Sequence, residues 1–326
     1  MTTIVEHPVS GVRRDSGAQR FSDVQPFSDV QAGPYGVTVT DDGAVWFTLV
    51  HAGQVGRRDP DGSLAFADLG EGAQPSQLAR ATDASVWVTD TTGDRIVHIG
   101  RDAQNPQNAQ DRQSARNAIR VLNEVSVPTV GSSPFGLASV HDGTVWFTEL
   151  ATDALGRVDI MGRVTEFPVG RTDVLPSMIA TSGDSVWFTL NQGNAVGHVR
   201  GGDAAIQFFD LPRASSGPVG IAVAENGAVW FAEVLGGALG RIGRDGVLTE
   251  FPLPDPLSKP HAITADPAGG CWFSLWGSNQ IGFVSDAGDF TLHDLPTPAS
   301  EPHGIAVAPD GHVWVALERG ALAELA

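Results

Sequence analysis

Short apolar runs alternate along the whole chain with turns rich in Gly, Asp and Asn. Around Trp230, residues 217–224, 228–234, 238–242 and 247–254 read as four strands, separated by the turn sequences ENG, LGG and GRDG. Alternating or short apolar runs bounded by turn residues are typical of β-strands. Since no segment keeps the period of an amphipathic helix, the pattern predicts an all-β protein.

The same four-strand pattern repeats, and tryptophan marks the repeat. Seven of the eight tryptophans share one frame, with a proline about 12 residues before each. Units of about 42 residues with four strands are typical of β-propeller blades. The pattern therefore predicts a single domain over residues 1–326, a seven-bladed propeller of four-stranded antiparallel blades, with tryptophans packed between blades. They are Trp46, Trp87, Trp146, Trp187, Trp230, Trp272 and Trp314.

Two departures from the repeat are informative. Residues 101–118 lengthen one interval with a polar stretch rich in Gln and Asn, which indicates an insertion in a surface loop. The last unit ends one strand short, and residues 20–27 (RFSDVQPF) resemble fourth-strand segments such as residues 247–254. We therefore expect the N-terminal strand to complete the last blade and close the ring.

Composition narrows the class of function. The chain of 326 residues has 38 acidic and 20 basic side chains, a net charge of −18, which argues against nucleic acid or an anionic membrane as partner. The lone Cys271 cannot form an intrachain disulfide and reads as a packed core thiol. Neither a signal-peptide apolar region nor a run of about 18 apolar residues occurs, so we expect a cytoplasmic protein. We also expect it to be a monomer.

Function in a propeller is to be sought where one repeat differs from the others. The residue after the repeat proline begins the innermost strand, at the mouth of the channel. Histidine occupies this place in two adjacent blades, so the two side chains are expected at one rim and favour a functional site. Around the ring the residues are Tyr35, Ser76, Phe135, Ser177, Val219, His261 and His303.

Two carboxylates are expected near these histidines. Glu301 precedes the last repeat proline and Glu318 follows the second strand of the last blade, and no other blade has an acid at either place. The two ends of a hairpin face the same rim, so both carboxylates should converge on His261 and His303. Paired carboxylates suit Mg²⁺, whereas two histidines alone would favour softer metals.

Aromatic side chains are expected at the same rim. Trp276 is the tryptophan outside the repeat frame, and Tyr35 and Phe135 complete a hypothetical wall for a bulky apolar ligand. We interpret the acids three residues after a repeat tryptophan as partners of turn or strand-end amides; they are Asp90, Glu149 and Glu233. The other histidines are interpreted as surface or structural residues; they are His7, His51, His98, His141, His198, His293 and His312.

Several segments resemble the virginiamycin B lyase family, seven-bladed propellers that linearise streptogramin B antibiotics. The similarity begins near residue 30 and covers most of the chain. Its specific part is KPHAIT and EPHGIAV, followed by ALE; GPYGVTV, GPVGIAV and LWGSNQIG also match. In that family a Mg²⁺-dependent elimination opens the cyclic depsipeptide at its ester.

The resemblance implies a role for each residue of the matching motifs. His303 would be the general base, and His261 a second catalytic or substrate-positioning histidine. Glu301 and Glu318 would hold Mg²⁺. The aromatic positions lining the substrate cleft match Tyr35 and Trp276.

Two other functions remain open from the sequence. One is a lactonase-like propeller hydrolase that uses a metal-activated water, and the other is a propeller that only binds partners. Product mass separates the first from a lyase, because hydrolysis adds one water and elimination does not.

Overall fold

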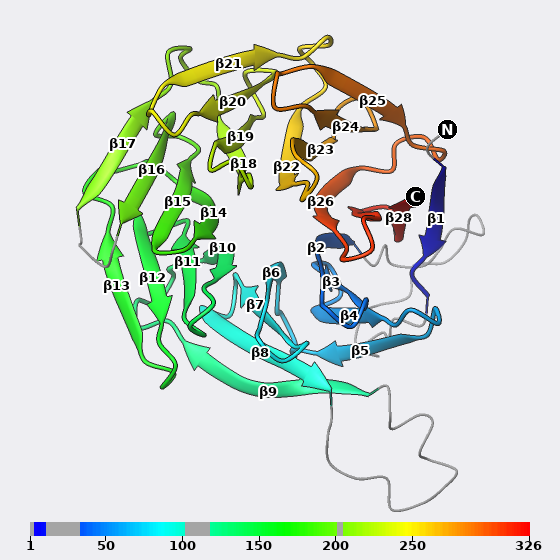
Figure 1. Ribbon diagram of the computed structural model, residues 1–326. Coiled ribbons are helices and arrows are strands. Elements are labelled where there is room, and N and C mark those ends of the chain that lie inside the picture. The colour runs from blue at the N-terminus through cyan, green and yellow to red at the C-terminus, as the bar shows by residue number, and fades with distance from the viewer. Residues whose placement is uncertain (1–2, 11–32, 102–117, 201–204) are drawn as a thin grey trace, which may run out of the picture.

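The computed structural model describes residues 3–10, 33–101, 118–200 and 205–326, and within them the chain forms seven antiparallel four-stranded sheets arranged as the blades of a ring (Figure 1). The predicted seven-bladed β-propeller is confirmed. In blades 1 to 6 the strands follow chain order, with the first strand innermost and the fourth outermost. No helix among these residues is long and apolar enough to cross a membrane. Residues 102–117, most of the predicted insertion, lie outside the described residues.

The first three blades use strands β2 to β13. Blade 1 holds β2 (Pro34–Val39), β3 (Val45–Leu49), β4 (Gln54–Arg58) and β5 (Leu64–Asp68). Blade 2 holds β6 (Pro75–Arg80), β7 (Val86–Asp90), β8 (Arg95–Arg101) and β9 (Ile119–Ser126). Blade 3 holds β10 (Pro134–Ser139), β11 (Val145–Glu149), β12 (Ala154–Val158) and β13 (Val164–Pro168).

The remaining blades use β14 to β28 and the N-terminal β1. Blade 4 holds β14 (Pro176–Ser182), β15 (Ser185–Leu190), β16 (Ala195–Arg200) and β17 (Ile206–Asp210). Blade 5 holds β18 (Pro218–Val223), β19 (Val229–Glu233), β20 (Ala238–Ile242) and β21 (Leu248–Pro252). Blade 6 holds β22 (Pro260–Ala265), β23 (Cys271–Leu275), β24 (Gln280–Val284) and β25 (Phe290–Asp294). Blade 7 holds β26 (Pro302–Val307), β27 (Val313–Leu317), β28 (Ala321–Leu325) and β1 (Ile4–Pro8).

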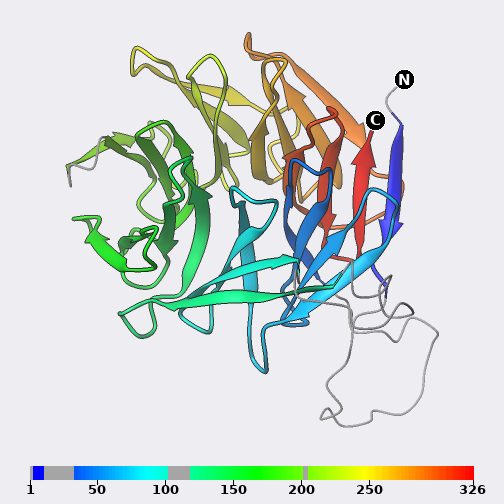
Figure 2. The same ribbon diagram turned by 60° about the horizontal axis from the view of Figure 1, so that its bottom comes forward.

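The N-terminal strand closes the ring, as predicted, but a different segment forms it. β1 pairs antiparallel with β28, from Ile4 opposite Leu325 to Pro8 opposite Ala321. Figure 2 shows the two strands side by side near the chain ends. The assignment of residues 20–27 to this place is therefore wrong, because β1 already occupies the outer edge; residues 20–27 lie outside the described residues. The outer edge is half exposed and imposes only a weak sequence pattern.

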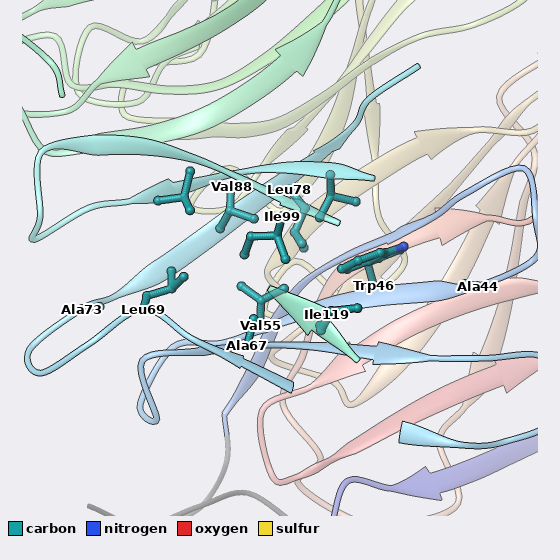
Figure 3. Packing of buried hydrophobic residues seen from close by; sticks show 12 residues of the cluster. Ala44, Trp46, Val55, Ala67, Leu69, Ala73, Leu78, Val88, Ile99 and Ile119 are labelled. Carbon is teal, nitrogen blue, oxygen red and sulfur yellow. The ribbon is translucent and has the colours of Figure 1, made fainter. Parts of the chain in front are cut away.

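The core lies between blades, and the repeat tryptophans are part of it. Trp46 is fully buried in a cluster that joins blade 1 to Val86, Val88 and Ile99 of blade 2 (Figure 3). The other six lie in or against clusters that span neighbouring blades in the same way. Cys271 is buried in one of them, and burial raises the pKa of its thiol to about 12. Inter-blade burial of large aromatic side chains therefore holds the ring together.

The acids three residues after the repeat tryptophans differ in their hydrogen-bond partners. Asp90 accepts hydrogen bonds from the amides of Gln74 and Gly93 and from Nε of Arg95, as expected for a strand-end partner. The expectation is wrong for Glu149, whose hydrogen bond comes from the Thr152 hydroxyl at 2.5 Å and whose Oε1 has no partner. It is also wrong for Glu233, whose two carboxylate oxygens lack hydrogen-bond partners.

Glu149 makes stability depend on pH. The pKa of Glu149 is raised from 4.5 to about 7, chiefly by burial and then by the carboxylates of Glu166 and Asp94, against the opposing hydrogen bond from Thr152. Between these two pKa values the folded chain keeps a proton that the unfolded chain releases, so stability falls as pH rises from 4.5 to about 7. Glu149→Gln removes that penalty and is expected to raise the melting temperature more at pH 8 than at pH 5.

Asp90→Asn is the matched control, because this acid stands at the same place in blade 2 and is paired with Arg95 at 2.8 Å. It is expected to lower the melting temperature at both pH values. Thermal unfolding of the two variants and the parent chain measures the effect. A Glu149→Gln variant destabilised equally at pH 5 and pH 8 would contradict the account.

Candidate functional site

Each inner strand has a bulge near its start, at the end of the blade that carries the candidate residues. In all seven blades the pairing of the first and second strands shifts register just after the repeat proline. A bulge leaves its extra residue outside the ladder and redirects the side chain. The residue after the proline therefore stands at the point where the regular ladder is interrupted.

Four aromatic rings from these bulges meet at the rim. The Tyr35 ring lies 4.6 Å from that of His303, 5.8 Å from that of His261 and 6.3 Å from that of Phe135, measured between centroids. The two histidine rings are 4.7 Å apart, edge to face, and the Tyr35 hydroxyl is 3.4 Å from Nε2 of His261. The structure thus brings together side chains from blades 1, 3, 6 and 7.

The backbone of His303 is fixed from both neighbouring blades. The Ser274 hydroxyl of blade 6 donates a hydrogen bond of 2.6 Å to the His303 carbonyl. On the other side, Gly304 packs so tightly that a Cβ there would lie 2.6 Å from the Tyr35 carbonyl oxygen of blade 1. Only glycine permits this approach, so the histidine stands at a seam with little freedom to shift.

Glu318 reaches the same histidine from the end of β27. Its Oε2 lies 2.5 Å from Nε2 of His303, and its amide donates a 3.0 Å hydrogen bond to the Glu301 carbonyl. Glu301 has a left-handed backbone, φ 56°, and its Oε1 is 3.7 Å from Nε of Arg319. The backbones of Glu301 and Glu318 are therefore joined by a hydrogen bond, and both carboxylates lie at one rim.

Burial keeps both histidines uncharged at neutral pH. Burial, together with a smaller effect of the adjacent His303, lowers the pKa of His261 to about 3. Burial also lowers the pKa of His303, against the opposing effect of the Glu318 and Glu301 carboxylates. The pKa of the Tyr35 phenol is raised, chiefly by burial and then by the charge of Glu318. The rim therefore combines neutral imidazoles, a protonated phenol and two carboxylates.

Trp276 stands beside this group and is open to solvent. Its side chain is 38% exposed, the largest such fraction among tryptophans in the described part of the chain, and its ring lies 6.3 Å from that of His303. The Lys259 ammonium sits 4.4 Å from the Trp276 ring centroid, a cation–π contact that holds the indole. An exposed indole at the edge of a channel can contact an apolar ligand.

One residue of this group was missed from the sequence. His51, interpreted above as surface or structural, is half exposed, and its Nε2 lies 2.8 Å from Oε1 of Glu318, a contact that the sequence did not indicate. It stands in blade 1 and its partner in blade 7, 267 residues apart. Comparison of equivalent repeat positions cannot reveal a pair that joins different positions of different blades. The predicted adjacency of the first and last blades was the one signal in the sequence that could have pointed to this pair.

The donor set fits a hard cation that keeps water ligands. Among the described residues, no group of three or more His, Cys, Asp and Glu side chains is arranged to hold a metal ion. The Glu301 and Glu318 side chains are 38% and 23% exposed, so water can reach both carboxylates. Two carboxylates completed by waters are a typical Mg²⁺ environment in proteins.

Comparisons with known proteins identify the family of this chain. The sequence profile described as Virginiamycin B lyase family matches residues 22–325. A virginiamycin B lyase of Nocardia farcinica is 39% identical over 217 residues, which cover 66% of this chain and 68% of that protein.

Solved structures are similar over the full chain. A streptogramin B lyase superposes with a TM-score of 0.84 at 28% identity, covering 100% of this chain and 97% of that one. A catalytically inactive histidine-to-alanine variant of virginiamycin B lyase from Staphylococcus aureus, with quinupristin, gives a TM-score of 0.84 at 30% identity and covers 100% and 99%. The chain therefore belongs to the virginiamycin B lyase family.

Proposed function

We propose that this protein is a Mg²⁺-dependent lyase that linearises streptogramin B-type cyclic depsipeptides by elimination at the ester, which inactivates the antibiotic. The observation that carries the proposal is a neutral His303 fixed at the channel rim within 2.5 Å of Glu318 and beside His261. Family membership and the likeness to a structure with quinupristin support the substrate class.

The chemistry assigns a task to His303. Elimination takes the proton from the carbon next to an amide carbonyl; that electron pair forms a carbon–carbon double bond, and the carbon–oxygen bond of the ester breaks. The products are a dehydrated threonine and a free carboxylate. Removing a weakly acidic proton requires an unprotonated base whose pKa lies near the working pH. The lowered pKa of His303 keeps its imidazole neutral at pH 7.

The other residues would bind and orient the substrate. Tyr35 and Trp276 offer aromatic faces for the apolar rings of the depsipeptide, and His261, also neutral, would position it beside His303. Glu301 and Glu318 would hold Mg²⁺, which when bound supplies a Lewis acid for a carbonyl or leaving carboxylate.

Incubation with quinupristin tests the proposal. With Mg²⁺ present, we expect loss of the intact antibiotic and a linear product of unchanged mass. A chelator should stop the reaction, and added Mg²⁺ should restore it. Intact quinupristin after prolonged incubation with Mg²⁺ would contradict the proposed activity, and a product heavier by one water would favour the lactonase-like hydrolase.

A further inference from the structure

We propose that His51 is a positioning residue for Glu318, holding this carboxylate in the orientation needed at the rim. The inference rests on the proposed function, because Glu318 is there assigned to Mg²⁺. Nε2 of His51 lies 2.8 Å from Oε1 of Glu318, while Oε2 lies 2.5 Å from Nε2 of His303. Imidazoles from blades 1 and 7 therefore contact the two oxygens of one carboxylate.

The His51 ring packs against the glycine that precedes the repeat proline of its own blade. Gly33 has φ 65°, and a Cβ on it would lie 2.5 Å from Cδ2 of His51, so the ring rests against a position that only glycine leaves open. The amide of Val50 donates to the Gly33 carbonyl at 3.1 Å and anchors the loop that carries the histidine. The ring is thus placed by the backbone rather than by a second side chain.

Blade 5 repeats this arrangement without a carboxylate. Gly217 has φ 60°, and a Cβ on it would lie 3.0 Å from Cγ of Leu235, the residue that stands where blade 1 has His51. Leu235 is 69% exposed. Since the loop forms equally well around leucine, the fold does not require histidine there. The contact with Glu318 is therefore our explanation for a histidine at this position.

We expect the loss of His51 to weaken Mg²⁺ binding rather than to lower the stability of the fold. A carboxylate with both oxygens contacted has fewer accessible orientations, so less entropy is lost when a cation binds. Partners of metal ligands typically change metal affinity or activity by about 10-fold to 100-fold. His51 itself is half exposed, so its removal leaves no buried cavity.

His51→Ala and Gly33→Ala test this by independent routes, one removing the ring and the other displacing it. Mg²⁺ affinity is measured by calorimetry on antibiotic-free protein, and kcat and KM for quinupristin are measured across Mg²⁺ concentrations. We expect at least about a tenfold weaker affinity for Mg²⁺ in both variants, with kcat recovering at high Mg²⁺. His51→Gln, which keeps a donor, should restore most of the affinity.

Leu235→Ala and Gly217→Ala are the matched controls, because they repeat the same changes, including the strained backbone, in blade 5. They should bind Mg²⁺ like the parent chain. Unchanged Mg²⁺ affinity in His51→Ala, or a lowered melting temperature with no change in affinity, would overturn the inference and leave His51 as an inter-blade contact. A parent chain that binds no Mg²⁺ would overturn it as well. Normal Mg²⁺ binding with this His51 dependence, but no antibiotic conversion, would reject the proposed function alone.

Discussion

Replacing His303 with alanine is expected to lower kcat/KM for quinupristin by about 100-fold to 10,000-fold, the usual contribution of a positioned general base. His303 is the rim histidine that combines burial, a carboxylate at 2.5 Å and an edge-to-face neighbour in His261. Without its imidazole, nothing in the proposed mechanism removes the proton. Steady-state kinetics at saturating Mg²⁺ measure the loss.

The controls separate chemistry from folding. The variant should keep the β-sheet circular dichroism spectrum of the parent chain, since the backbone of His303 is held by Ser274 and by the close packing of Gly304. His141→Ala alters an exposed histidine outside the rim and should leave kcat/KM unchanged. Activity of His303→Ala close to that of the parent chain would reject His303 as the base.

Removing residues 1–10 is expected to destabilise the whole ring. The truncation deletes β1, which pairs through five residues with β28 and covers the edge of blade 7. Main-chain hydrogen bonds contribute about 0.5–1.5 kcal/mol each, so the loss is on the order of several kcal/mol, a large fraction of a typical folding free energy. The stacking of His7 on Trp314 is lost with it. Urea or thermal unfolding of the truncated chain measures the effect.

A point variant makes the same test without shortening the chain. Val5 lies opposite Glu324 in the β1 and β28 ladder, and its side chain is 47% exposed. Val5→Pro removes an amide donor from this strand and should reproduce part of the destabilisation, whereas Val5→Thr should be nearly neutral. A truncated chain that unfolds at the temperature of the parent chain would show that the ring does not depend on β1.

The fold was largely predictable because the positions that recur from blade to blade are strongly buried. Trp46, Phe47 and their equivalents alternate with turn residues, and the inner three strands of each blade carry most of this burial. The outer strands carry less information: β1, β13, β17 and β25 share one pattern of intermediate and exposed residues. Two N-terminal segments fit such a weak pattern, and the sequence alone favoured the wrong one.

The site was predictable where it breaks the repeat symmetry and not where it joins different repeat positions. His261 and His303 occupy equivalent places, so alignment of the blades exposed them. His51 acts on Glu318 across the seam of the ring, which only the fold reveals. The sequence singled out Glu149 but not its incomplete hydrogen bonding, because the burial that leaves its Oε1 without a partner depends on packing around the blade rather than on local sequence.

The most direct test of the central claim is the mass of the product formed from quinupristin in water enriched in heavy oxygen. Elimination with His303 as base breaks the ester without adding solvent, so the linear product should have the mass of the substrate and carry no heavy oxygen. A product that gains one water, with heavy oxygen in its new carboxylate, would contradict the lyase account and identify a hydrolase.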